Sequence, residues 1–192
     1  MVNVGLLFGT FNPIHVGHMV IAEYFSEFAD LYEVWIVVSP HNPLKRQKDL
    51  LDDKERLHLV KLSIGKNKKI KASDIEFSLS RPSYTYNTLT HLKKTFPKHN
   101  FVLLMGEDNL QNFDRWKNFD KILKEFNIYA YPRPDSKSSR FHKHKNVKVF
   151  SEAPLMDISG TFIRNAIANG KSVRYMLPEK VLAYITKRKL YL

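Results

Sequence analysis

The sequence predicts an α/β fold in which a doubly wound parallel sheet carries helices on both faces. Short apolar segments alternate along the chain with stretches of helical periodicity. The apolar segments lack the polar/apolar alternation of a strand with one solvated face, so both faces of the sheet are expected to be buried. Strands that alternate with helices are joined by right-handed crossovers, which place helices on both sides of the sheet.

The strands follow one another at regular intervals. In chain order, the expected strands are Val2–Phe8, Val34–Val38, Lys69–Ser73, Phe101–Met105, Ile128–Tyr131 and Val147–Phe150. Ligands bind beyond the carboxyl ends of strands in such sheets. The loops after Phe8, Val38, Met105 and Tyr131 are therefore the places to look for a site.

The helices are marked by apolar residues three or four positions apart. The inward-facing residues expected for the first three are Ile21, Phe25 and Phe28, then Leu57, Val60 and Ile64, then Leu89, Leu92 and Phe96. A basic loop spans residues 132–145. Two closing helices are expected, one from about Ser159 with Ile163, Ala166 and Ile167 inward, and one opened by Pro178 with Val181 and Ile185 inward.

Composition fits a single folded domain over residues 1–192. The chain is 43% hydrophobic and 26% charged, which suits one core of this size. No apolar run approaches the roughly 18 residues of a membrane span, and the amino end lacks the features of a signal peptide. We expect a cytoplasmic protein with no membrane partner. The absence of cysteine excludes a disulfide scaffold and a thiolate metal site.

The charge is strongly positive, with 31 Lys and Arg against 19 Asp and Glu, or +12. An excess of this kind indicates an anionic partner, which is RNA, a membrane surface or a phosphorylated small molecule. The positive residues are scattered, and neither a basic recognition helix nor an aromatic-rich recognition motif is present. Nucleic acid is therefore not the expected partner, although an RNA-binding protein stays the alternative from another class.

The loop after the first strand is the most informative segment. It reads GTFNPIHVGH over residues 9–18. Gly9 permits a tight turn, and His15 and His18, three residues apart at the start of a helix, project to one side. Free backbone N–H groups and the helix dipole favour phosphate there, and imidazoles add donors for a transferring phosphoryl group. A histidine pair can also form half of a metal site, but no third ligand at a convincing spacing is present, so no protein-held metal is expected.

This segment resembles the GTFDPxHxGH signature of the nucleotidylyltransferase superfamily, which transfers a nucleoside monophosphate to a phosphorylated acceptor and releases pyrophosphate. ISGTFIR, residues 158–164, is similar to the second signature of that superfamily, ISSTxIR. Ser159 is a good N-cap, and Arg164 can reach phosphate with a fork of donors. The resemblance implies a Rossmann-like nucleotidylyltransferase fold.

Three further segments bear on the acceptor. PSYTYNTL, residues 82–89, resembles the PSYTxxTL segment of bacterial nicotinate-nucleotide adenylyltransferases, and Thr85 would cap the following helix or lie in its first turn, whose N–H groups suit a carboxylate. GEDNLQNFDRW, residues 106–116, is similar to GxDxLxxFxxW, in which the tryptophan stacks on the pyridine ring. PHNPLK, residues 40–45, loosely resembles the family's PPHK loop. By themselves these segments could also be a capped helix, a core tryptophan and a surface lysine.

The resemblance implies a site for each substrate. The catalytic residues would be Thr10, His15, His18 and Arg164, with ATP bound by Gly9, Phe11, Gly106, Asp108, Ser159 and Thr161, and the acceptor bound by Lys45, Tyr84, Thr85 and Trp116. The implied reaction joins the adenylyl group of ATP to nicotinate mononucleotide, giving nicotinate adenine dinucleotide and pyrophosphate in NAD biosynthesis. Mg²⁺ would be the cofactor and would bridge the ATP phosphates, held mainly by them and by water.

The sequence departs from the signatures at three positions. Phe8 takes the place of a glycine, Asn12 that of the aspartate, and Gly160 that of a serine. Asn12 cannot be an anionic ligand, whereas Gly160 keeps its backbone N–H for phosphate. Phosphopantetheine adenylyltransferase is the alternative within the superfamily, followed by cytidylyl transfer to a polyol phosphate. The sequence leaves open whether the chain forms a homo-oligomer.

Overall fold

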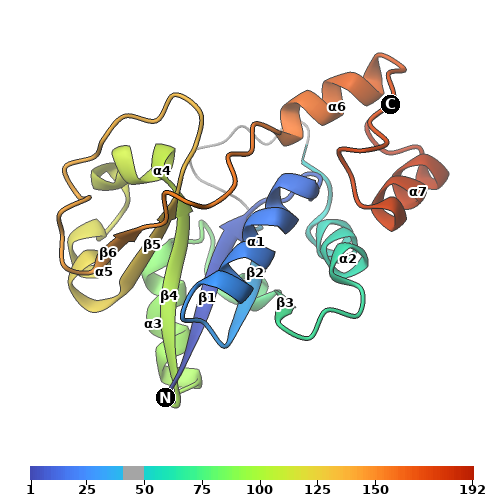
Figure 1. The fold of residues 1–192 in the computed structure, drawn as a ribbon. Coiled ribbons are helices and arrows are strands. Elements are labelled where there is room, and N and C mark those ends of the chain that lie inside the picture. The colour runs from blue at the N-terminus through green and yellow to red at the C-terminus, as the bar shows by residue number, and fades with distance from the viewer. Residues whose placement is uncertain (41–49) are drawn as a thin grey trace.

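The protein is described here by a computed structural model that covers residues 1–40 and 50–192, and six strands of this part form one parallel sheet (Figure 1). The strand order is β3-β2-β1-β4-β5-β6. The strands are β1 (Val2–Gly9), β2 (Glu33–Val38), β3 (Ile70–Ser73), β4 (His99–Gly106), β5 (Asn127–Tyr131) and β6 (Val147–Val149). The predicted parallel α/β sheet is confirmed, because the strands form where the buried apolar runs lie.

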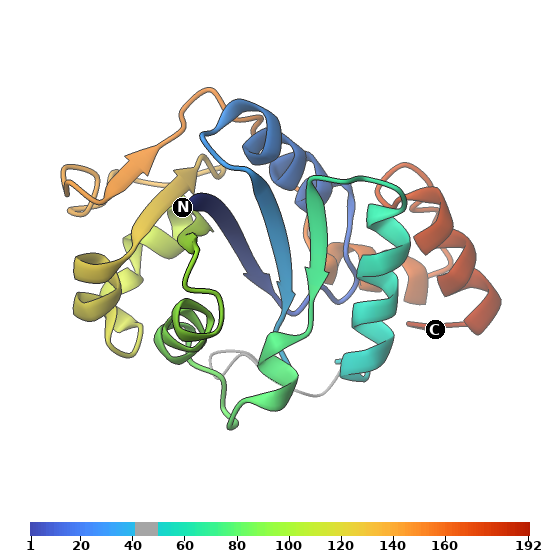
Figure 2. The same ribbon diagram turned by 90° about the horizontal axis from the view of Figure 1, so that it is seen from below.

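Helices cover both faces of the sheet, as Figure 2 shows from below. On one face the core includes residues from α1 (Val16–Phe28), α2 (Asp53–Ile64), α6 (Gly160–Ala168) and α7 (Glu179–Arg188). On the other it includes residues from α3 (Thr85–Thr95), α4 (Glu107–Gln111) and α5 (Phe119–Glu125), together with the 3-10 turn η2 (Phe113–Arg115). A second turn, η1 (Ile75–Ser78), follows β3. No helix in the described residues is long and apolar enough to cross a bilayer.

Side chains of the central strands alternate between these two cores. In β4, Leu103 and Met105 join the core beside α3, whereas Val102 and Leu104 join the core beside α1. All four are buried. A strand that is apolar at every position thus fills both layers, which is why its sequence shows no polar alternation.

The predicted inward position of Phe28 is wrong. Its side chain is 73% exposed, because it is the last residue of α1 and the chain turns away at Ala29 to enter β2. The ring stacks on Tyr24, one helical turn earlier, with 5.2 Å between centroids. Contact with a neighbouring ring on the helix surface takes the place of burial in the core.

The order of the strands creates a switch point between β1 and β4. From β1 the chain proceeds outward to β2 and β3, and from β4 it proceeds outward in the opposite direction to β5 and β6. Loops that leave these two strands therefore separate and open a crevice at their carboxyl ends. This is the upper edge of the sheet in Figure 1, where α1 and α4 begin.

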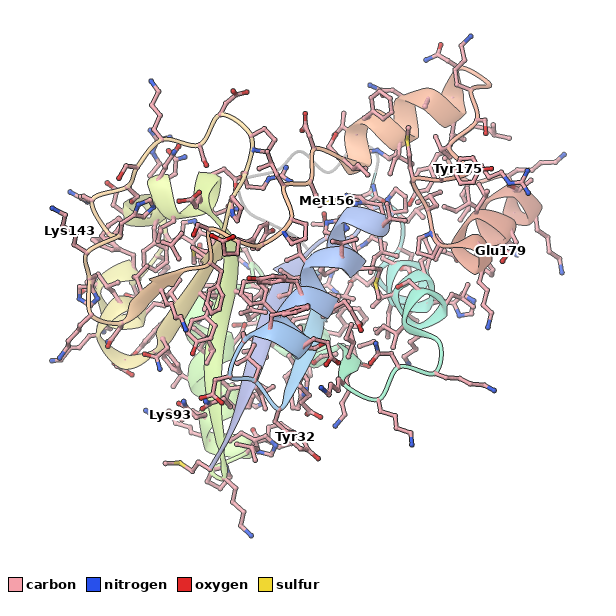
Figure 3. All side chains as sticks on the ribbon, in the orientation of Figure 1. Tyr32, Lys93, Lys143, Met156, Tyr175 and Glu179 are labelled. Carbon is pink, nitrogen blue, oxygen red and sulfur yellow. The ribbon has the colours of Figure 1, made fainter. Side chains whose placement is uncertain are left out.

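The basic segment after β5 is anchored rather than fully solvated. Phe141 is buried in the core beside α3, and the Ser139 hydroxyl donates to the Leu110 carbonyl at 3.0 Å. The lysines of this segment instead point away, as Lys143 does at the outer edge of the molecule in Figure 3. Much of the positive charge therefore lies in solvent.

Candidate active site at the switch point

A cavity of about 480 Å³ opens at the carboxyl ends of the central strands. Its size is in the range of small-ligand sites. Six of the predicted site residues line it, namely Gly9, Thr10, Tyr84, Thr85, Gly106 and Trp116. His15, His18, Ser159, Thr161 and Arg164 are outside this lining. The predicted site therefore consists of the cavity and an adjoining segment, residues 9–18, called here the phosphate loop, whose Gly9 and Thr10 belong to both.

The two histidines of the phosphate loop lie against one another at the start of α1. His15 is the N-cap residue, and its ring stacks on that of His18 with 3.6 Å between centroids. The backbone N–H of His15 donates to His18 Nδ1 at 3.3 Å. The edge of the Phe11 ring meets the His18 ring at 4.9 Å between centroids. The predicted pairing of two imidazoles at a helix N-terminus is therefore present.

Burial keeps the inner histidine neutral. Burial, with a smaller contribution from the nearby positive charge of Arg133, lowers the pKa of His15 to about 4. Gly17 allows this packing, because a Cβ there would lie 3.1 Å from His15 Nδ1. At neutral pH the His15 imidazole therefore acts as a neutral hydrogen-bonding group.

Stability should decrease in acid because of His15. The unfolded chain protonates this residue near pH 6.5, whereas the folded chain does so only near pH 4. Between these values the unfolded state binds more protons, so the free energy of unfolding should fall by up to about 3 kcal/mol as the pH drops from 6.5 to 4. Urea titrations over this range measure the effect.

Two variants separate this contribution from that of other titrating groups. In His15→Gln the free energy of unfolding should no longer show this fall between pH 6.5 and 4. His58→Gln, at an exposed position of α2, should still show it. An identical pH slope in His15→Gln and the unchanged protein would contradict the assignment.

The start of α6 lies against the phosphate loop. Arg164 Nη1 donates to the backbone carbonyl of Asn12 at 2.8 Å, and Nη2 lies 3.4 Å from Thr161 Oγ1. The Ser159 hydroxyl accepts from the N–H of Phe162 at 3.2 Å, which confirms the predicted N-cap. Because a Cβ on Gly160 would lie 2.9 Å from the Asn12 carbonyl oxygen, the glycine permits this close approach.

The segment after β4 supplies a different residue from the one expected. Gly106 lines the cavity, and a Cβ there would collide with the side chains of Asp108 and Arg133. Asp108 itself is exposed, 4.0 Å from Arg133 Nε, and is not in the cavity lining. Its neighbour Asn109 is in the lining. The turn into α4 therefore places Asn109 rather than Asp108 at the cavity, and sequence periodicity does not reveal this five-residue helix.

Three of the residues predicted to bind the acceptor, Tyr84, Thr85 and Trp116, line the same cavity. Thr85 is the first residue of α3 and Tyr84 its N-cap, without a side-chain capping bond, so Thr85 lies in the first turn. Trp116 is half-buried, with 5.5 Å between its ring centroid and that of Phe113. Lys117 adds a positive charge, with Nζ 4.2 Å from the centroid of the Tyr84 ring. Trp116 therefore combines the two roles considered for it, since it packs on the core and faces the cavity.

A buried arginine supports the phosphate loop and was not anticipated. Arg56 on α2 has no exposed surface. Its guanidinium donates to four carbonyls and to one carboxylate: Thr10 at 2.6 Å, Ser39 at 2.8 Å, Pro40 at 3.0 Å, Leu51 at 2.9 Å and Asp53 at 2.6 Å. It joins the loop after β1 to the loop after β2. Nothing in the sequence distinguishes it among 31 basic residues.

The donor set does not form a protein cage for a divalent ion. In residues 1–40 and 50–192, no three histidine or acidic side chains gather in the manner of a metal site.

The Asn12 Oδ1 accepts from Leu51 N at 3.3 Å and from the Tyr191 hydroxyl at 2.8 Å. Lys45, expected at the acceptor, falls outside the described residues.

Comparisons with known proteins agree with this geometry. A family model described as cytidylyltransferase-like matches residues 6–166. A Cytophaga hutchinsonii protein named "Probable nicotinate-nucleotide adenylyltransferase" is 50% identical over 188 residues, which are 98% of this chain and 97% of that protein. A Bacteroides fragilis protein with the same name is 45% identical over 184 residues, covering 96% of this chain and 91% of its own.

A solved structure extends the likeness to three dimensions. The nicotinic acid mononucleotide adenylyltransferase of Plasmodium falciparum, complexed with APC, matches with a TM-score of 0.83 at 20% identity, over 100% of this chain and 98% of the other. At that identity the match shows a common fold. The sequence matches, which span almost the whole chain, go further: the chain belongs to the cytidylyltransferase-like family and, within it, to the nicotinate-nucleotide adenylyltransferases.

Proposed function

We propose that this chain transfers the adenylyl group of ATP to nicotinate mononucleotide at the switch point, forming nicotinate adenine dinucleotide and pyrophosphate. The observation that carries the proposal is the junction of two subsites. A phosphate loop with stacked imidazoles adjoins a cavity whose lining also includes an indole and the first residue of a helix, Thr85. A Plasmodium falciparum relative in fold is complexed with NaAD, which supports the same product here.

The chemistry is a direct displacement at phosphorus. An oxygen of the acceptor phosphate forms a bond to the α-phosphorus of ATP, and the bond from that phosphorus to the bridging oxygen of the β-phosphate breaks. The leaving pyrophosphate takes the electron pair. Because the attacking phosphate is already ionised at neutral pH, alignment and charge stabilisation suffice, without a covalent enzyme intermediate.

The phosphate loop supplies the donors for this step. We assign Thr10, His15, His18 and the backbone at Gly9 and Phe11 to the triphosphate. His15, neutral at physiological pH, contributes an N–H rather than a positive charge. The fixed positive charge comes from Arg164, which together with Ser159 and Thr161 is assigned to the departing pyrophosphate.

The remaining residues hold the two nucleosides. Gly106, Asp108 and the neighbouring Asn109 are assigned to the ATP ribose, Asp108 through a rotation of its exposed side chain. Tyr84, Thr85 and Trp116 are assigned to the pyridine end, where first-turn N–H groups of α3 receive the carboxylate and the indole stacks on the ring. Lys45 stays a prediction for the acceptor phosphate.

The proposed metal ion would bind together with ATP. Enzymes of this family use ATP, commonly with a divalent ion, and we propose that Mg²⁺ arrives bound to ATP. The residues described offer phosphate-binding donors rather than a carboxylate cage, which fits an ion held by phosphate oxygens and water. Bound in this way, Mg²⁺ neutralises phosphate charge.

Pyrophosphate release tests the proposed function. The assay contains ATP and Mg²⁺ with nicotinate mononucleotide, nicotinamide mononucleotide or phosphopantetheine as acceptor. A strong preference for the nicotinate acceptor is expected. A preference for phosphopantetheine would contradict the acceptor assignment and leave the phosphate loop in place. Absence of turnover with all three would contradict the proposed reaction, and tighter, steeply salt-dependent binding of RNA than of mononucleotides would favour the alternative class.

Trp116→Ala should weaken binding of the acceptor and leave binding of ATP nearly unchanged. Loss of the stacked indole should raise KM for nicotinate mononucleotide about tenfold or more, because ring stacking on an indole contributes on the order of 1 kcal/mol beyond the area buried. KM for ATP should change less than about twofold, since His15, His18 and Arg164, which are assigned to the triphosphate and pyrophosphate, do not line this cavity. Steady-state kinetics with each substrate varied in turn measure both values.

Trp116→Phe is the matched control, because it keeps an aromatic face and should recover most of the affinity. Equal losses for both substrates in Trp116→Ala would identify a purely structural tryptophan.

A further inference from the structure

A tyrosine near the end of the sequence reaches the phosphate loop. The Tyr191 hydroxyl lies 2.8 Å from Asn12 Oδ1, although the two residues are 179 positions apart in the sequence. Leu190 packs against the core beside α1, and Figure 1 shows the end of the chain between α6 and α7. The final segment is therefore held next to the loop that separates β1 from α1.

The direction of this hydrogen bond follows from a second contact. The Leu51 N–H also points to Asn12 Oδ1, at 3.3 Å. A backbone N–H can only donate, so the atom that it faces is the amide oxygen, and the Tyr191 hydroxyl must donate to that same oxygen. Burial raises the pKa of the Tyr191 phenol, so this donor keeps its proton in the pH range of enzyme assays.

The backbone of Tyr191 is fixed at some cost. Its φ is 66°, in the left-handed region that side chains with a Cβ rarely adopt. Such a conformation persists where the surroundings over-determine it. Here the phenol is partly buried next to the charges of Arg164 and Arg56. The chain end is thus held in one conformation that directs the hydroxyl to Asn12.

Asn12 is the residue through which this contact acts on the loop. Its side chain is held by Tyr191 and Leu51, and its carbonyl by Arg164 at 2.8 Å. Its neighbour Phe11 has a φ of 47°, so this part of the loop is itself in an uncommon conformation. Thr10 and His15, assigned to the triphosphate, lie two residues before and three residues after Asn12.

We propose that Tyr191 is a positioning residue for adenylyl transfer, a latch whose hydroxyl holds Asn12 so that the phosphate loop keeps its donors in place. This inference rests on the proposed function for its effect on turnover, but the latch itself is a property of the unliganded protein. Tyr191 does not line the cavity. Its influence on the reaction is therefore indirect, through the geometry of residues 10–15.

Tyr191→Phe removes the hydroxyl and keeps the ring. We expect kcat to fall about tenfold, because small displacements of groups that align reactants cost between tenfold and a hundredfold. KM for nicotinate mononucleotide should stay within about twofold, since the acceptor end of the cavity is formed by α3 and Trp116. A residue needed only for stability would lower the melting temperature without this selective loss in kcat.

Tyr184→Phe is the matched control. Tyr184 is a phenol on α7 whose ring packs on His58, with 4.7 Å between centroids. The kcat of the Tyr184→Phe variant should stay within about twofold of that of the unchanged protein. Asn12→Ala completes a double-mutant cycle, in which Tyr191→Phe should have no further effect once Asn12 is absent. If kcat of the double variant fell by the product of the two single losses, the two residues would act independently and the latch would be overturned. A loss of kcat in Tyr184→Phe equal to that in Tyr191→Phe would also overturn it.

Amide hydrogen exchange gives a readout that needs no acceptor. In the unliganded protein, Tyr191→Phe should speed exchange in residues 10–16 at least severalfold, and Tyr184→Phe should leave it unchanged. Normal turnover in Tyr191→Phe would overturn the proposal even if exchange were faster, and unchanged exchange would overturn the latch itself. If the unchanged protein fails to turn over any acceptor, the proposed function fails and the exchange result alone decides whether the latch exists.

Discussion

Replacement of His18 by alanine is expected to lower kcat by about a hundredfold or more while the fold stays intact. The His18 ring stacks on His15 at the start of α1. Because His18 Nδ1 accepts from the His15 N–H, a neutral His18 imidazole carries its proton on Nε2, and this is the donor we assign to the transferring phosphoryl group. Loss of one preorganised donor to developing charge costs on the order of 10² in rate.

Single-turnover pyrophosphate release measures the chemical step in His18→Ala, and urea unfolding checks the fold. Binding of an ATP analogue should be reduced less than kcat, because Arg164 and the helix N-terminus are unchanged. His58→Ala, an exposed histidine on α2, serves as the control and should react normally. Turnover within about threefold of the unchanged protein would refute the role of His18.

Replacement of Arg56 by methionine is expected to cost about 3–5 kcal/mol in the free energy of unfolding. The methionine fills most of the volume but leaves the carbonyls of Thr10, Ser39, Pro40 and Leu51 without the donor that each has now. It also leaves Asp53 without its buried partner. Removal of one member of a buried, hydrogen-bonded ion pair is among the most destabilising single changes.

The midpoint of urea unfolding measures this loss, provided that the slope is unchanged. Arg81→Ala is the matched control, since Arg81 pairs with the other carboxylate oxygen of Asp53 at 2.7 Å but has a 59% exposed side chain. It should cost less than about 1 kcal/mol. Arg56→Lys should resemble Arg56→Met, because one ammonium group cannot reach four carbonyls on separate loops. Equal, small effects in Arg56→Met and Arg81→Ala would contradict the role of the buried guanidinium.

The sequence predicted the parts of the fold that depend on local patterns. The central strands stand out because β1 and β4 contain continuous apolar runs, residues 4–8 and 101–105, and the N-terminal ends of the last two helices follow from Ser159 and Pro178. The histidine pair also lies at the start of a helix, as predicted, and Tyr84, Thr85 and Trp116 line one cavity, while their role in binding the acceptor stays a prediction. In each case the signal is a short segment whose own residues determine its conformation.

Features that depend on contacts distant in the sequence were missed. Arg56 and Tyr191 resemble surface residues until the loops that they hold are brought together. The short helices α4 and α5 have five and seven residues, too few for a helical period to emerge. The sequence analysis also did not assign Asn109, which lines the cavity, whereas Asp108, predicted to bind ATP, is not in the lining. Phe28 fits the helical spacing of the inward-facing residues, but it is the last residue of α1 and its side chain is exposed.

The contacts of Asn12 indicate when, during folding, the nucleotide subsite is completed. During synthesis residues 9–18 emerge early, yet the partners that hold Asn12 include Leu51, Arg164 and Tyr191, the last of them 179 positions later. Contacts of such long sequence separation form late and slowly, after the entropy of the intervening chain has been lost. A nascent chain with the central strands already paired still lacks a finished nucleotide subsite, so competence for adenylyl transfer appears at the end of folding rather than gradually.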